Sequence, residues 1–178
     1  MEHSITPYFQ HVYGVVITFE GVKQACRTVA DATFLQFDGA CLPFPDETFD
    51  VAFAVCVMHH VPPPQWRDFT VEMARVVKPG GLVIVFEHNP YNPLTRVSVS
   101  RCEFDRDATL LPRRQTYHLL KNAGMTELKD RFILFFPWSG KFWRGVERAL
   151  HQLPLGAQYY VAGIKCQHGI EGQKVSTL

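Results

Sequence analysis

Two strongly apolar segments separated by one helical pattern constrain this chain more than any other feature. Residues 49–58, FDVAFAVCVM, and residues 82–87, LVIVFE, are apolar at almost every position. A strand with one covered face would alternate apolar and polar side chains, so an uninterrupted apolar run predicts a strand buried on both faces. We therefore predict two parallel strands lying side by side, the first of them central in its sheet.

The segment between these strands has a helical period. From Gln65 onward, apolar side chains recur at intervals of three and four positions, namely at Trp66, Phe69, Met73, Val76 and Val77. Prolines 62–64 can begin a helix, and Pro79-Gly80-Gly81 is predicted to end it.

The same alternation continues on both sides and predicts an α/β fold class. Strands are expected at residues 11–17, 32–37, 130–137 and 158–165, and helices at 18–30, 107–123 and 142–150. Pro112 stands either in the first turn of the second helix or at its true start, and residues 88–96 are expected to form a loop. The prediction is one three-layer domain over residues 1–166, mostly parallel with an antiparallel last strand, followed by a polar tail at 167–178.

Composition and charge exclude several functional classes. With 18 basic and 17 acidic residues the net charge is +1, so no overall field attracts nucleic acid or a membrane. Five cysteines without a C-x-x-C pair, and no H-E-x-x-H motif, predict neither disulfides nor a metal site. The first residues do not read as a signal peptide and no apolar run is long enough to span a bilayer, so we expect a cytoplasmic protein.

The central motifs carry a family resemblance. Residues 37–61, FDGACLPFPDETFDVAFAVCVMHHV, and residues 74–87, ARVVKPGGLVIVFE, resemble the class I S-adenosylmethionine-dependent methyltransferases of the small-molecule type. The resemblance extends over roughly residues 11–166. It implies a Rossmann-like sheet, S-adenosylmethionine as cofactor and a small-molecule acceptor, with the ligands beyond the carboxyl ends of the strands.

The resemblance also implies cofactor contacts. Asp38 would accept a hydrogen bond from the adenine amino group, with Gly39 and Ala40 leaving room beside the ring. The alternative interpretation makes Asp38 an ordinary turn residue. Val55 and Cys56 would line the methionine portion of the cofactor.

Acceptor contacts are implied at the same strand ends. His59 or His60 would face the transferred methyl group and position or deprotonate the acceptor, since imidazole titrates near neutrality. Alternatively, one histidine is a packed supporting group and the other is solvated. The further acceptor candidates, which a polar loop explains equally well, are Glu87, His88, Asn89 and Tyr91. Tyr91 or Trp138 are candidates for cation–π contacts with the sulfonium.

Two departures from the family pattern stand out. No pair of glycines forms the G-x-G of the cofactor loop, which together with the first strand is expected before residue 11. Val16 stands where an acidic residue usually binds the ribose, and Glu20 is the possible substitute. We therefore predict an N-terminally truncated sheet in which residues 11–17 and 49–58 pair directly, residues 1–9 fill part of the gap, or a second subunit covers it. A homodimer is the expected result.

Two functions of different classes remain open. The chain is a methyltransferase that aligns acceptor and methyl group for direct displacement, impaired to some degree by the absent loop. Alternatively, it is a non-catalytic binding or structural module that keeps the fold. A dinucleotide-dependent oxidoreductase is weaker, because it needs the same glycine fingerprint and LPFPDETFD, residues 42–50, does not belong to it.

Overall fold

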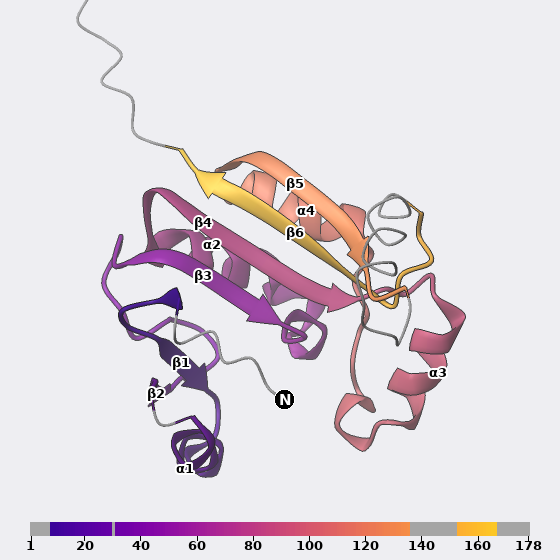
Figure 1. Cartoon of the computed structure of the whole chain (residues 1–178), viewed down its shortest axis with the longest axis horizontal. Coiled ribbons are helices and arrows are strands. Elements are labelled where there is room, and N and C mark those ends of the chain that lie inside the picture. Colours follow the sequence, from indigo (N-terminus) through magenta and orange to yellow (C-terminus); the bar gives the residue numbers. More distant parts are fainter. Residues whose placement is uncertain (1–7, 30, 136–152, 167–178) are drawn as a thin grey trace, which may run out of the picture. The chain divides into compact units, whose positions relative to one another are not determined.

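The computed structural model describes residues 8–29, 31–135 and 153–166 (Figure 1). The helix predicted at 142–150, Trp138 and the tail at 167–178 lie outside these ranges. The chain divides into two compact units, Met1–Pro45 and Asp46–Leu178.

The first unit is a strand, a helix and a second strand. Strand β1 (Tyr13–Val16) pairs in parallel with β2 (Thr33–Gln36), and helix α1 (Phe19–Thr28) connects them. The helix begins after Thr18, whose side-chain oxygen accepts a hydrogen bond from the Gly21 amide at 3.1 Å. This order confirms the prediction for the region.

The second unit is built on a four-stranded mixed sheet. Its strands are β3 (Phe49–Val55), β4 (Val77–His88), β5 (Met125–Ile133) and β6 (Gln158–Lys165), and their order is β3-β4-β6-β5. Strand β3 is parallel to β4, whereas β6 is antiparallel to both β4 and β5. Three strands therefore point one way and the last strand runs against them, as predicted.

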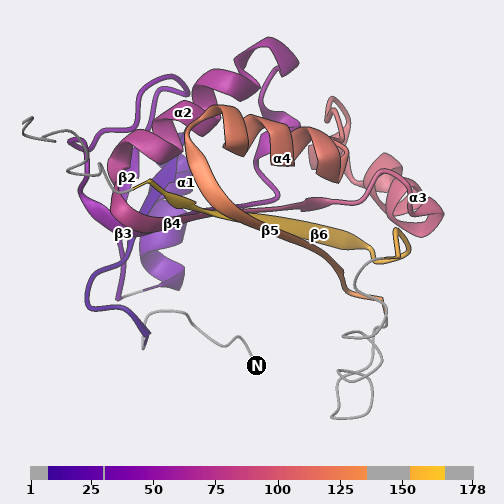
Figure 2. The same ribbon diagram turned by 90° about the horizontal axis from the view of Figure 1, so that it is seen from above.

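Helices α2 (Trp66–Val76) and α4 (Arg113–Asn122) cover one face of this sheet (Figure 2). The core lies between them and the inward side chains of the two inner strands, including the fully buried Val83, Val85 and Val161. Such alternating burial on neighbouring strands is the source of most of the stabilisation of a domain of this size.

Strand β3 differs from its prediction as a central, doubly covered strand. Among the described residues it pairs with β4 alone, so it lies at the edge of the four-stranded sheet. On its outer face Phe53 is 44% exposed and Val55 52% exposed. The apolar run correctly indicated a strand, but it did not determine the position of that strand, because strand order is a tertiary property.

The boundary between helix α2 and strand β4 was predicted incorrectly. Helix α2 passes into β4 directly at Val77, so Pro79-Gly80-Gly81 lies within a bulge of that strand, opposite the register shift between Phe49 and Val51. Gly80 makes this possible because its φ of 78° lies in the left-handed region.

Residues 88–96 do not form a loop throughout. Helix α3 (Pro93–Arg101) begins within them, because the Asn92 side chain accepts hydrogen bonds from the amides of Leu94 and Thr95. Helix α4 begins after Pro112, which is the second of the two predicted starts. Gly124, with φ 86°, ends it and β5 follows at once. In the described part of the chain, no helix has the length and apolar character needed to cross a membrane.

Tyr159, on strand β6, forms hydrogen bonds to the beginning of helix α4 and to the segment just before it. Its hydroxyl lies 2.7 Å from the Thr116 hydroxyl and donates to the Leu111 carbonyl at 2.9 Å, and the side chain is fully buried.

Replacing Tyr159 by Phe leaves two buried polar groups without this partner, so we expect a loss of about 1–3 kcal/mol of unfolding free energy in urea titrations. Tyr91→Phe, at an exposed position, is the control. Equal stability of the two variants would contradict this role.

Candidate functional site

The carboxyl ends of β3 and β4 bring together the polar residues of the second unit. The Cys56 amide donates to the Phe86 carbonyl at 2.9 Å, which continues the parallel pairing one residue past β3. A short 3-10 helix, Met58–His60, follows immediately, while Glu87 and His88 end β4. Because parallel strands end at the same edge, histidines and carboxylate meet there.

Glu87 is the anchor of this edge. Its side chain is fully buried, one carboxylate oxygen accepts from the Met58 amide at 2.7 Å, and the other lies 2.6 Å from His59 Nδ1. An ionised carboxylate only accepts, so Nδ1 carries the proton of this bond. His59 itself is 2% exposed. The sequence prediction that one histidine is a packed supporting group therefore fits His59.

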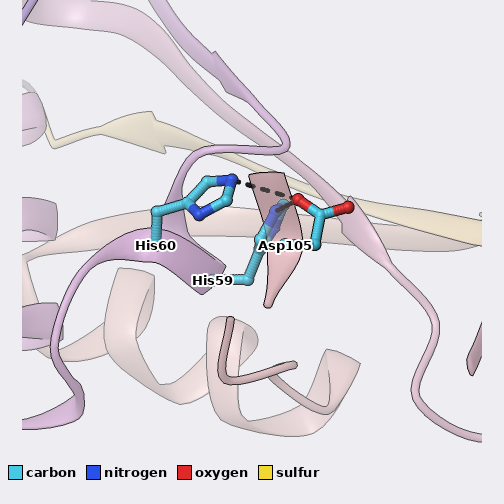
Figure 3. Close-up of side chains that lie close together, drawn as sticks. All are labelled: His59, His60 and Asp105. Carbon is cyan, nitrogen blue, oxygen red and sulfur yellow. Dashed lines mark ion pairs between the residues drawn. The ribbon is translucent and has the colours of Figure 1, made fainter. Parts of the chain in front are cut away.

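Asp105 completes the cluster from another part of the chain. It ends the 3-10 helix Glu103–Asp105, and its Oδ1 lies 3.4 Å from His59 Nε2 and 3.3 Å from His60 Nε2 (Figure 3). The Thr109 amide donates to the His59 carbonyl at 2.8 Å and ties the two segments together. The His60 side chain is 44% exposed, so it is the member of the pair that meets solvent.

The charges of the cluster shift its titrations. Burial disfavours the charged form of His59, but the hydrogen bond and charge of Glu87, with the charge of Asp105, outweigh it and raise the pKa of His59. Burial and the neighbouring His59 lower the pKa of His88. Burial, together with Glu87 and Asp105, raises the pKa of Cys56 to about 11, so this thiol stays protonated at neutral pH.

Cys56 leaves strand β3 in an unusual conformation. Its φ of 53° lies in the left-handed region, which non-glycine residues adopt rarely. Its sulfur accepts a hydrogen bond from Gln158 Nε2 at 3.4 Å. Such backbone strain at a strand end is common next to functional sites, and here it turns the chain towards the histidines.

Asp38 and its neighbours belong to the first unit. Asp38 Oδ1 accepts from the amides of Ala40 at 2.9 Å and Cys41 at 3.1 Å, and these bonds lower the pKa of the exposed carboxyl. Gly39 has φ 88° in this turn. The turn interpretation of Asp38 is thus satisfied, while a carboxylate has more acceptor positions than two bonds occupy.

The other predicted contacts lie in different settings. Val55 ends β3 and is half exposed, and Tyr91 is 63% exposed. Glu20, in the first turn of α1, pairs with Lys23 at 3.0 Å. Asn89 is fully buried and its amide nitrogen donates to the carbonyls of residues 154 and 156, so it supports the loop before β6.

Sequence reasoning missed Asp105. Residues 103–107 read EFDRD, a polar stretch at the expected start of a helix, and no spacing relates them to His59-His60. Only the turn that brings this segment back over the strand ends places the carboxylate beside the imidazoles.

Comparison with known proteins agrees with this architecture. Residues 3–85, which span Asp38, His59, His60 and most of β4, match the model of a methyltransferase domain. Residues 3–85 thus belong to a methyltransferase domain of the class I S-adenosylmethionine-dependent type. Membership of this family implies S-adenosylmethionine as co-substrate.

Two curated enzymes are among the relatives of this chain. A 2-methyl-6-phytyl-1,4-hydroquinone methyltransferase of Synechocystis is 39% identical over 85 residues, which cover 46% of this chain and 26% of the relative. A phthiotriol/phenolphthiotriol dimycocerosates methyltransferase of Mycobacterium tuberculosis is 30% identical over 124 residues, which cover 64% of this chain and 43% of the relative. The chain thus aligns with less than half of the length of either.

A solved structure shows the same fold. A methyltransferase from Thermotoga maritima, described as a possible histamine N-methyltransferase, superposes with a TM-score of 0.70. It is 24% identical, and the superposition covers 90% of this chain and 75% of that one. At this identity the likeness concerns the fold.

The opposite pKa shifts of His59 and His88 predict opposite pH dependences. A raised folded-state pKa stabilises the chain below the unfolded value of about 6.5, and this contribution disappears as pH rises through the folded-state pKa. The stability difference between wild type and His59→Gln should therefore shrink as pH rises above about 6.5. For His88→Gln the wild type should instead gain relative stability as pH rises towards that value. Urea titrations across this range measure both. Differences that are flat or parallel for the two variants would disprove the assignment.

Proposed function

We propose that this chain acts as a small-molecule methyltransferase, with the cluster at the ends of β3 and β4 on the acceptor side of the reaction. The observation that carries the proposal is the connection from Glu87 through His59 and Asp105 to His60. This connection holds the half-exposed His60 side chain beside a carboxylate, and an imidazole held in this way can serve as a base or a positioning group for an acceptor.

The roles within the cluster follow from burial. Glu87 and His59 are enclosed and act as positioning residues. His60 is the residue that touches the acceptor, and Asp105 holds its ring and stabilises the imidazolium formed when His60 takes a proton. Methyl transfer itself is a direct displacement at the sulfonium carbon, so alignment of acceptor and methyl group supplies most of the catalysis.

Phenolic lipids are the acceptor class that we favour. Two relatives carry names that denote such or similarly apolar acceptors, a phytylated hydroquinone and the phthiotriol/phenolphthiotriol dimycocerosates. A hydroquinone hydroxyl or ring carbon becomes nucleophilic on deprotonation, which is the step that His60 would assist. His88, with its lowered pKa, and Tyr91 remain proposed acceptor contacts.

Asp38 is proposed as the adenine acceptor, with Gly39 and Ala40 beside it, and Val55, Cys56 and Glu20 as weaker cofactor candidates. The variant Asp38→Asn distinguishes adenine binding by Asp38 from the part that Asp38 plays in its turn. An asparagine oxygen can still accept from the Ala40 and Cys41 amides, but the second carboxylate oxygen becomes a donor and repels the adenine amine. We expect unchanged thermal unfolding and about tenfold or greater loss of S-adenosylmethionine affinity by calorimetry.

Transfer of a labelled methyl group to 2-methyl-6-phytylhydroquinone and simpler phenols tests the reaction. His60→Gln should lower the rate about 100-fold with unchanged cofactor affinity. His118→Gln, an exposed histidine on α4, should have no effect. Equal rates for the two variants would remove His60 from the mechanism.

The second candidate is a non-catalytic methyltransferase-like module. The observations in its favour are local: the Asp38 carboxylate already closes a turn, and the Asn89 side chain is engaged by backbone carbonyls. Absence of calorimetric heat and of any thermal shift with both S-adenosylmethionine and S-adenosylhomocysteine at millimolar concentration would select this alternative.

We further propose that the chain forms a homodimer through β3, whose outer face exposes Phe53 and Val55 at the edge of the four-stranded sheet. Light scattering at micromolar concentration should give the mass of two chains, and Phe53→Lys should give the mass of one. Asp50→Lys, on the same strand, reverses a charge without removing apolar area and should remain dimeric if burial of Phe53 drives association. A wild-type monomer would refute the proposal.

A further inference from the structure

We propose that His59, His60 and Asp105 form a binding site for a divalent transition-metal ion of the zinc class. Figure 3 shows the three side chains pointing towards one another from two separate segments of the chain. Each contributes one ligand atom, and these atoms all lie within 4.8 Å of one another. Two imidazoles and one carboxylate are a common protein ligand set for zinc.

The distances fit a shared ion better than direct hydrogen bonds. Asp105 Oδ1 lies 3.4 Å from His59 Nε2 and 3.3 Å from His60 Nε2. Hydrogen bonds between nitrogen and oxygen span about 2.7–3.2 Å. Two ligand atoms each about 2.1 Å from a tetrahedral ion lie roughly 3.4 Å apart, so Asp105 Oδ1 has the separation from each histidine nitrogen that two ligands of one ion would have.

A buried carboxylate orients the deepest ligand. Glu87 accepts the Nδ1 proton of His59 at 2.6 Å, which leaves Nε2 with its lone pair on the side of Asp105. This carboxylate–histidine pairing recurs behind metal-bound histidines, where it fixes the tautomer and the ring orientation. Because Glu87 and His59 are both buried, this ligand is set before any ion arrives.

The donor set determines the class of ion. Nitrogen ligands favour zinc, cobalt and related ions over magnesium and calcium, which prefer oxygen alone. The half-exposed His60 gives access from solvent, and three protein ligands leave a coordination position open for water or an acceptor oxygen.

Ion binding is independent of methyl transfer, because it is measured without cofactor or acceptor. His60 Nε2 cannot hold an ion and a proton at once, so the metal-bound form would exclude His60 as the base.

Cobalt titration of the chelator-treated full chain is the direct test. Bound Co²⁺ should develop visible ligand-field absorption with one ion per chain, and Zn²⁺ should abolish the spectrum by competition. The exposed Cys26, Cys41 and Cys166 are alternative ligands. A thiolate-to-cobalt charge-transfer band, or no cobalt spectrum at all, would overturn the proposal.

A matched pair of variants locates the ion. Asp105→Asn and Glu103→Gln each replace an acid by its amide in the same short helix, but the Glu103 side chain is 85% exposed and faces Arg106. Asp105→Asn should weaken cobalt and zinc binding about tenfold or more, and Glu103→Gln should leave both unchanged. If circular dichroism shows that Asp105→Asn does not fold, His60→Gln serves instead. Equal affinity in the ligand variant and in Glu103→Gln would overturn the site.

Discussion

The buried pair of Glu87 and His59 is the interaction on which the organisation of this unit depends. Glu87 ends one strand and holds both the amide of Met58 and the ring of His59, which follow the neighbouring strand. Burying a carboxylate costs free energy unless its oxygens accept hydrogen bonds. Once β3 and β4 are paired, the arrangement in which Met58 and His59 bond to Glu87 is therefore favoured over arrangements without these bonds. It fixes the turn after β3 and the direction in which the second histidine points.

The rest of the cluster is placed from this pair outward. Trp66, which starts helix α2, donates its indole proton to the carbonyls of Met58 and Val61, so the helix is joined to the same turn. Asp105 lies in the short helix that follows α3 in the chain, and the hydrogen bond from the Thr109 amide to the His59 carbonyl holds this segment in place. Hydrogen bonds of Glu87, Trp66 and Thr109 with the backbone around residues 58–61 therefore determine where His60 lies, and its half-exposed side chain gains a defined position without being buried.

The two proposed uses of the cluster share one physical basis. Two imidazole nitrogens face a single carboxylate oxygen, so positive charge is needed among them, as protons or as one metal ion. When His60 Nε2 carries a proton beside Asp105, the other nitrogen of the same ring can act as the base for an acceptor, whereas an ion gives a Lewis-acidic centre with an open position. The methyltransferase family assignment is compatible with either, since methyl transfer depends mainly on alignment.

The apolar runs and the helical period of the sequence predicted most of the elements and their order, and the family resemblance implied the antiparallel last strand. Short segments that are apolar at every position are stable mainly as buried strands, so they could be recognised from the sequence. The motifs that follow these strands predicted His59, His60 and Glu87 at one edge of the sheet. Tertiary structure alone decided that β3 lies at an edge of its sheet and that Asp105 joins the histidines. Strand order and the return of a distant turn depend on contacts between residues far apart in the chain, which local patterns do not encode.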